Sequence, residues 1–235
     1  MAYRNGPKII TDGLVLCLDA AISKSYPGSG TTWHDLSGRG NNGTLINSPV
    51  YNTENKGYFV LGNTNGYVSV PDTTDFDFDY MTLEYVLRPR DSIHVRPFIN
   101  RSDESSWSPF RFLMATDNTK DSSVRFMFQI HISSTVYWIS SDNGVYNTSD
   151  IQNVVCVYDG SEMSMYVNGN KQSDTESISG VLDKSNLPLK IAINNAYNPD
   201  RYAHQYCYSV KLYNQALSSD QIYKNYNATR GRFGI

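Results

Sequence analysis

The sequence predicts an all-β protein built from antiparallel strands. Residues 154–158 (VVCVY) place apolar side chains on both sides of an extended chain, as expected of a strand between two packed layers. Asp159-Gly160 and Asn168-Gly169 favour tight hairpin turns, and residues 163–167 alternate between them. A helical period is almost absent elsewhere, so these observations together indicate a meander of paired strands.

The length and composition are typical of one β domain. A chain of 235 residues suits a single sandwich or barrel, and 40% hydrophobic residues suffice for a core of ordinary size. The 18 tyrosines suit strands, where aromatic side chains are enriched. We expect an N-terminal arm over residues 1–12 and one domain over residues 13–235.

Charge and hydropathy exclude two classes of partner. The net charge of −3 and the lack of clustered Lys and Arg argue against nucleic acid, whose affinity depends on such clusters. No apolar run approaches the roughly 20 residues of a membrane span, and residues 1–13 lack the apolar core of a signal peptide. We therefore expect that the protein is made in a cytoplasm and does not insert into a membrane. The sequons at Asn42, Asn100, Asn147 and Asn227 carry little weight without a secretion signal.

The three cysteines are predicted to be buried thiols. Cys17, Cys156 and Cys207 each lie within an apolar strand pattern. Their odd number and wide spacing favour small core residues over disulfides, metal ligands or nucleophiles.

The first half of the chain predicts short strands separated by Asn and Gly turns, together with one long polar loop. The predicted strands are 13–21, 44–46, 58–61, 66–70 and 81–88. The loop over residues 25–43 is rich in Gly, Ser and Asn. Trp33 in it is either a platform for a sugar ring or, as we expect, a plug that anchors the loop to the core. Asp35 is expected to cap a turn in preference to binding a cation.

The segment 97–140 carries the first candidate binding residues. On the strand around 124–132, the odd-numbered residues Arg125, Met127, Gln129 and His131 share one face, opposite an apolar face. This row is either a solvated surface or the floor of a polar groove whose donors bind sugar hydroxyls. Arg111 is expected to extend the row from a neighbouring strand.

The last part predicts strands at 187–194 and 206–213 and one short C-terminal helix. Ser218 followed by Gln221 forms a capping-box pattern, and Ile222 and Tyr226 lie one turn apart on an inward face. We expect the helix to span 219–226, with Asn227 and Gly231 as stops.

Six segments resemble, in order, the concanavalin A-like or laminin G-like jelly-roll domains. They are GLVLCLDAA, SYPGSGTTWHDLSGRGNNGTL, YVSVP, LEYVLRP, VYDGSEMSMYVNGN and YSVKLYNQALSSDQIYKNYNATRGRFGI. The NATRGRFG tail is similar to that of versions in bacteriophage virion proteins and some bacterial surface proteins. The resemblance implies a two-sheet antiparallel jelly-roll sandwich whose relatives bind glycans, mediate adhesion or build viral particles.

The resemblance does not support a calcium site. Where family members carry acidic residues in an FDG..DYV segment, this chain has LGNTNGYV, with Gly62, Asn63 and Asn65. Where they carry an acidic pair before a late strand, it has Tyr208 and Ser209. We therefore expect no cofactor.

The fold also includes glycoside hydrolases, so an enzyme is the first alternative. Retaining hydrolysis needs two carboxyl groups about 5 Å apart. Sandwich hydrolases supply them from one strand in a Glu-x-Asp-x-Glu pattern, which none of the five glutamates of this chain enters. No G-x-S-x-G nucleophile motif occurs either. We expect no catalytic residues.

The second possibility is a lectin-like binder, since sugar recognition uses aromatic faces together with fixed amide and guanidinium donors. The candidates in or near loop signals are Trp107, Trp138, Asn194, Asn195, Tyr197, Arg201 and Tyr202. Trp138 is equally consistent with a core residue, and the tyrosines with cover for strand edges.

The third possibility is a building block whose loops bind neighbouring subunits. The sequence thus predicts a non-enzymatic virion protein, such as a capsid decoration or tail fibre protein, that binds glycans through a jelly-roll domain. Its expected partners are glycans, other virion proteins or copies of itself. A bacterial surface adhesion module and a hydrolase of the same fold are the alternatives.

Overall fold

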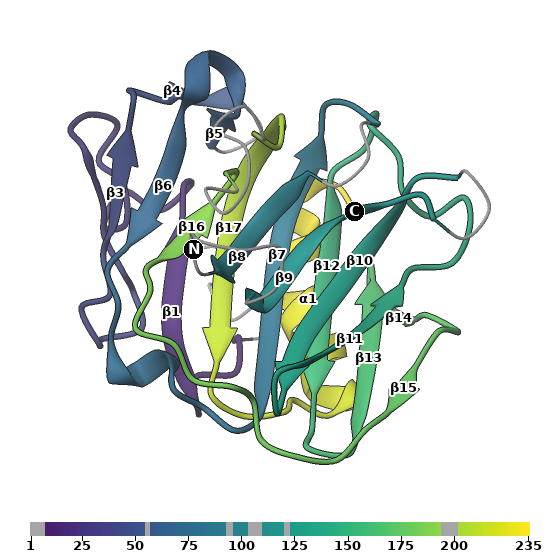
Figure 1. Ribbon diagram of the computed structural model, residues 1–235. Coiled ribbons are helices and arrows are strands. Elements are labelled where there is room, and N and C mark those ends of the chain that lie inside the picture. Colours follow the sequence, from purple (N-terminus) through teal and green to yellow (C-terminus); the bar gives the residue numbers. More distant parts are fainter. Residues whose placement is uncertain (1–7, 55–56, 93–95, 103–109, 120–122, 194–201) are drawn as a thin grey trace.

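A computed structural model describes residues 8–54, 57–92, 96–102, 110–119, 123–193 and 202–235 of the chain. Two antiparallel sheets pack face to face, and one C-terminal helix lies on the outside of one of them (Figure 1). The predicted all-β sandwich with one helix is therefore confirmed.

Sheet A lies next to the helix, and sheet B forms the other layer. Sheet A runs in spatial order β14 (Asn170–Lys171), β13 (Glu162–Val167), β12 (Gln152–Tyr158), β7 (Met81–Pro89), β17 (Gln205–Tyr213), β5 (Tyr58–Leu61) and β4 (Val50–Asn52), with β1 (Leu14–Asp19) paired to β17 and β15 (Glu176–Ser177) to β13. Sheet B runs β11 (Thr135–Ser140), β10 (Arg125–Ile132), β9 (Phe110–Asp117), β8 (Pro97–Ser102), β16 (Leu189–Ile191), β6 (Tyr67–Val70), β3 (Gly43–Ile46) and β2 (Thr32–Trp33). Short 3-10 turns occur at Asn63–Asn65 and Thr74–Phe76.

Strand β12 shows why the alternation in the sequence predicted a central position. Val154, Cys156 and Tyr158 belong to the main core between the sheets. Val155 and Val157 belong to a second cluster with Ile222 of the helix. Both faces of the strand are therefore covered, by sheet B on one side and by the helix on the other.

The helix α1 (Ser219–Phe233) is longer than predicted. The capping box of Ser218 and Gln221 is present, and Ile222 and Tyr226 are buried as expected. The predicted end at residue 226 is wrong, because the helix continues through Gly231 to Phe233 and is capped by Gly234, whose φ is 74°. Phe233 explains the extension, since its ring packs at 5.6 Å on Tyr208 of sheet A and holds the last turn down.

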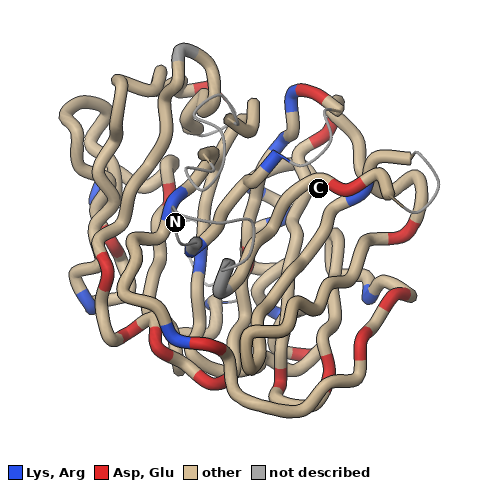
Figure 2. Tube along the Cα trace, viewed as in Figure 1, with Lys and Arg blue, Asp and Glu red and all other residues tan. Residues whose placement is uncertain are grey.

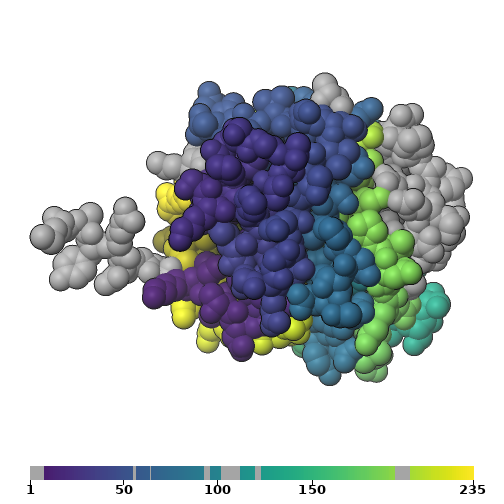
Figure 3. All heavy atoms as spheres, turned by 90° about the vertical axis from the view of Figure 1, so that its left-hand side faces the viewer, coloured from purple at the N-terminus to yellow at the C-terminus, as the bar shows by residue number. Residues whose placement is uncertain are grey.

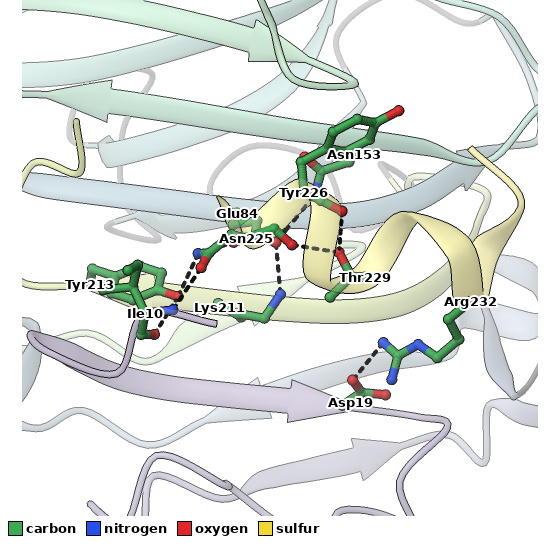
Figure 4. Close-up of polar contacts among 10 residues, drawn as sticks. All are labelled: Ile10, Asp19, Glu84, Asn153, Lys211, Tyr213, Asn225, Tyr226, Thr229 and Arg232. Carbon is green, nitrogen blue, oxygen red and sulfur yellow. Dashed lines mark hydrogen bonds and ion pairs between the residues drawn. The ribbon is translucent and has the colours of Figure 1, made fainter. Parts of the chain in front are cut away.

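A buried polar cluster joins the helix to sheet A and to the first described residues (Figure 4). The Lys211 amine lies 2.7 Å from Glu84 Oε1, and the Asn225 amide donates to Glu84 Oε2 at 2.8 Å. Asn225 also accepts from the backbone N of Ile10 at 2.7 Å, while Tyr213 donates to the Ile10 carbonyl at 3.1 Å. The helix and residue 10 thus close over the sheet together, and in Figure 3 the C-terminal residues border the first described ones.

The pKa of Lys211 reflects two opposing effects, one from burial and one from neighbouring negative groups. Both Lys211 and Glu84 are at most 2% exposed. Burial, the largest single influence, lowers the pKa of Lys211, but the charge and hydrogen bond of Glu84 together with the nearby Cys17 and Asp19 raise that pKa above its ordinary value. Lys211 is therefore held as a cation within the structure.

The long polar loop is anchored as predicted. Trp33 is fully buried and packs at 4.8 Å on Phe59, so it is a core plug and does not form a sugar platform. Asp35 accepts hydrogen bonds from the backbone N of Cys17 at 2.8 Å and of Ser37 at 2.9 Å. Its role in the described structure is that of a turn cap.

All three cysteines are free and buried, which confirms the prediction from their positions. Burial raises the pKa of Cys17 and of Cys207 to about 12, and it raises that of Cys156 further. Such thiols are not nucleophiles at neutral pH. Among the helices of the described ranges, none has the length and apolarity needed to cross a membrane.

Candidate functional site

The outer face of sheet B carries a row of side chains that runs from strand to strand across the whole sheet. We call it the sheet-B row. Because Phe128 and Ile130 face the core, Gln129 between them faces outward. Cross-strand pairing then connects Trp138, Gln129, Leu113, Asn100, Lys190, Ser69, Thr44 and Thr32 in that order.

The middle of this row is closed to solvent. Asn100 is fully buried, and its amide donates to the Ile193 carbonyl at 2.6 Å. The sequon at Asn100 therefore cannot accept a glycan in this structure. Lys190, its neighbour on β16, is also buried. The accessible parts of the row lie at its two ends, with Thr44 exposed on β3 at one end and Trp138 exposed on β11 at the other.

The predicted residues of β10 are brought together but differ in exposure. Gln129 and His131 approach to 3.5 Å between their Nε2 atoms, and Arg125 donates to the Ser141 carbonyl at 3.1 Å. His131 is 1% exposed, whereas Gln129 and Arg125 are half-buried. The row is therefore not a freely solvated surface. Gln129 is directly available to a ligand, and His131 lies beneath the surface.

Trp138 is the most informative of the predicted residues. It lies directly opposite Gln129, is 41% exposed, and stands next to Val136, which is 39% exposed. The alternative that Trp138 is a core residue is therefore wrong. An exposed indole on a paired strand is a rigid apolar platform, and Gln129 supplies amide groups beside it.

A groove of about 340 Å³ follows β11 where the edges of the two sheets meet. Val136, Tyr137 and Trp138 form one side, and Asp174 and Glu176 form the other. The Asp174 carboxylate accepts from the backbone N of Ser140 at 2.8 Å, which fixes the segment before β15 against β11. Glu176 is exposed. We refer to this feature as the β11 groove.

Asp174 and Glu176 were not predicted as site residues. Their spacing of two is the signal that could have found them, because alternate residues of a strand share a face. The sequence gives no indication, however, that residues 174–176 lie beside Trp138. That neighbourhood arises from sheet B meeting sheet A at one edge of the sandwich.

Several predicted residues cannot be placed. Asn194, Asn195, Tyr197, Trp107 and Arg201 lie outside the described residues. The backbone of Arg111 belongs to β9, but its side chain is outside the described set. Tyr202 is half-buried and forms a backbone bridge with Ile193. Their roles in ligand binding stay predictions.

The charges favour some ligands over others. Acidic residues gather along the lower edge of the molecule in Figure 2, whereas Lys and Arg are dispersed. Among the described side chains that line the β11 groove are two carboxylates and no Lys or Arg. Within the described ranges, no group of three His, Cys, Asp or Glu side chains is placed to hold a metal ion. The groove is therefore suited to ligands that donate hydrogen bonds.

Comparison with known families agrees with this fold. Residues 61–223 match the model of the concanavalin A-like lectin/glucanases superfamily. The chain belongs to this superfamily. The comparison with curated protein sequences found no match for this chain.

Solved structures share its architecture at low sequence identity. The binding domain of Paraclostridial Mosquitocidal Protein 1 aligns with a TM-score of 0.72 and 15% identity, over 93% of this chain and 52% of that one. The binding domain of Botulinum Neurotoxin DC in complex with SialylT gives 0.71 and 15%, over 93% and 52%. Domain 4 of AbnA, a GH43 extracellular arabinanase from Geobacillus stearothermophilus, in complex with arabinotriose, gives 0.64 and 14%, over 90% and 97%. The chain thus spans about half of the first two.

Proposed function

We propose that this superfamily member binds carbohydrate through the β11 groove without cleaving it. The observation that carries the proposal is Trp138, an indole 41% exposed on a strand and set beside a groove. A sugar ring stacks its apolar C–H face on such a platform.

The polar groups around Trp138 match the remaining needs of a sugar. Asp174 and Glu176 accept hydrogen bonds from hydroxyls, and the Gln129 amide both donates and accepts. Because the two carboxylates repel anions, the expected ligands are neutral or amino sugars. Acidic saccharides are expected to bind weakly here.

The fold relatives support carbohydrate as the ligand class. A botulinum neurotoxin binding domain was solved with SialylT, and the arabinanase domain with arabinotriose. The arabinanase domain is the more informative parallel, since the alignment covers nearly all of it. The activities of the complete neurotoxins and of the complete arabinanase are not transferred to this chain.

A glycan array followed by calorimetry with the best neutral hit tests the proposal. Trp138→Ala is expected to weaken binding about tenfold or more through loss of stacking, whereas Trp138→Phe retains most of it. Tyr223→Ala is the matched control, because Tyr223 is also an exposed aromatic but lies on α1. Silence across the array, or equal losses in Trp138→Ala and Tyr223→Ala, would contradict the proposal.

Hydrolysis is the alternative that Asp174 and Glu176 raise, since paired carboxylates are the equipment of a glycoside hydrolase. Reducing-end detection after incubation with the bound glycan separates the two functions. We expect binding without turnover. Turnover that disappears in Asp174→Asn or Glu176→Gln would replace the binding proposal with an enzymatic one.

The setting is a separate proposal. We infer a virion protein, made in the host cytoplasm, from the resemblance of the C-terminal segment 227–234 to bacteriophage virion proteins. Other virion proteins or copies of the same chain are then its partners. Detection of the protein in purified particles by mass spectrometry tests this setting, and its absence from particles would overturn it.

A further inference from the structure

A second pocket lies on the opposite sheet, where the C-terminal end of α1 stops short of covering sheet A. Its volume is about 420 Å³. Arg88 and Asn168 come from sheet A and its adjoining turn, Ser149, Asp150 and Ile151 from the loop before β12, and Phe233, Gly234 and Ile235 from the end of α1. We call it the Arg88 pocket.

Arg88 is held in position by stacking on a neighbouring aromatic ring. It pairs with Tyr206 across β7 and β17, and its guanidinium carbon lies 4.3 Å from the centre of the Tyr206 ring. Its Nε atom is buried and has no hydrogen-bonded acceptor among the described residues. Stacking thus orients the guanidinium plane, and because Nε is buried, a ligand would meet the terminal amino groups of the guanidinium.

Other arginines of the molecule show what is missing at Arg88. The buried Arg101 lies 3.3 Å from the Asp77 carboxylate, and Arg232 lies 2.7 Å from Asp19. Both bind a carboxylate supplied by the chain itself. A half-buried guanidinium in a pocket, lacking such a partner, is suited to a carboxylate supplied by a ligand.

The rest of the pocket resembles a site for a sugar ring more than a site for a simple anion. Ser149 contributes a hydroxyl and Asp150 a carboxylate. The Asn168 Oδ1 atom accepts from the backbone N of Asn153 at 2.9 Å, which leaves its amide N–H groups for a ligand. Ile151 and Phe233 add apolar surface.

The net charge limits the ligand to a single negative charge. Arg90 reinforces Arg88, since its guanidinium carbon lies 5.0 Å from the same Tyr206 ring. Asp150, which is exposed at the rim, opposes them. Arg88 and Asp150 balance each other among the described lining side chains and Arg90 adds one more distant positive charge, so the pocket suits a carboxylate better than a phosphate dianion.

We propose that the Arg88 pocket binds a saccharide unit that carries a carboxylate, with Arg88 receiving the carboxylate and Ser149 and Asn168 the hydroxyls. This site is independent of the β11 groove, because it lies on the outer face of the other sheet. Its ligand class is also the one that the acidic β11 groove disfavours.

Titration of the full chain with D-glucuronic acid, D-glucose and acetate, followed by NMR or calorimetry, tests the proposal. Glucuronic acid is expected to bind at least about tenfold more tightly than either glucose or acetate, since it alone combines charge and ring. Equal affinity for acetate would overturn the saccharide assignment. Equal affinity for glucose would overturn the role of the carboxylate.

Variants locate the site. Arg88→Gln and Arg88→Lys are both expected to lose about tenfold in glucuronic acid affinity, because lysine keeps the charge but not the planar fork. Asp150→Asn is expected to improve that affinity by removing repulsion. Trp138→Ala should leave it unchanged, so failure of the β11 groove and failure of the Arg88 pocket are distinguishable.

A thermal melt of each variant shows that it is folded. If Arg88→Gln unfolds, Arg88→Lys and Asp150→Asn still decide the result. Unchanged glucuronic acid affinity in all folded variants of Arg88 and Asp150 would overturn the proposal.

Discussion

The part of sheet A beneath α1 and the β10–β11 end of sheet B differ in what covers their outward-facing side chains. On sheet A, Glu84 and Lys211 are covered by α1 and are satisfied by Asn225 of that helix. On sheet B, Gln129 and Trp138 lie at one accessible end of the sheet-B row, beside the β11 groove. The polar groups beneath α1 are thus satisfied by the chain itself, whereas those beside the β11 groove can be satisfied by a ligand.

This difference shows that a polar residue on a strand does not reveal its role by type alone. Glu84 has the chemistry of a catalytic acid but is committed to Lys211 beneath the helix. Trp138 has the chemistry of a core residue but stands exposed. What decides each role is whether another segment of the chain covers the residue.

The largest expected effect on stability comes from removing the buried cation of the Glu84–Lys211 pair. Lys211→Met leaves the buried Glu84 carboxylate without its cation and is expected to lower the free energy of unfolding by about 3–5 kcal/mol. The double variant Glu84→Gln/Lys211→Met removes both charges and should recover much of that loss. Urea denaturation measures both, and a single-variant cost below about 1 kcal/mol would contradict the structural account.

A pH series tests the charge of Lys211 directly, and its expected effect on the free energy of unfolding is smaller. The folded state raises the pKa of Lys211 above its ordinary value of 10.5. The stabilisation from its charge is therefore complete below that value and is lost as the pH rises through the folded-state pKa. The stability difference between wild type and Lys211→Met, measured by urea denaturation, is expected to stay constant from about pH 8 to about pH 10 and to shrink as the pH rises above about 10.5. A difference that stays constant up to about pH 11.5 would argue against a charged Lys211.

The smallest effect on stability is expected at Trp138, at the exposed β10–β11 end of sheet B. Trp138→Ala removes a partly exposed side chain and should change the free energy of unfolding by about 1 kcal/mol or less. The same urea denaturation that is applied to Lys211→Met measures it. A loss as large as that of Lys211→Met would make Trp138 a structural residue and weaken the carbohydrate proposal.

Much of the fold could be predicted from local patterns. The alternation in residues 154–158 placed β12 between two covered faces, and the Ser218–Gln221 capping box located the start of α1. The end of α1 could not be predicted in this way. Gly231 is a stop signal by propensity, but Phe233 packs on Tyr208, some 25 residues earlier in the chain, and this tertiary contact overrides it.

The candidate sites were predictable only in part, because each combines segments that are distant in the sequence. The pattern on β10 identified Gln129 and its face, and Trp138 was among the candidate residues. Asp174 joins them only because β15 meets β11 at the sandwich edge. Arg88 gave no signal at all, since its lack of an acceptor is visible only once its neighbours are known.

The hydrogen bond between Ile10 and Asn225 spans 215 positions of the chain. Such a contact cannot form until residue 225 has been synthesised, so the docking of α1 follows the synthesis of every strand of both sheets. Until then Val155 and Val157 remain uncovered on the back of β12. A chain that stops before residue 225 therefore keeps this apolar surface exposed, which makes unfinished copies prone to aggregation and to binding by chaperones.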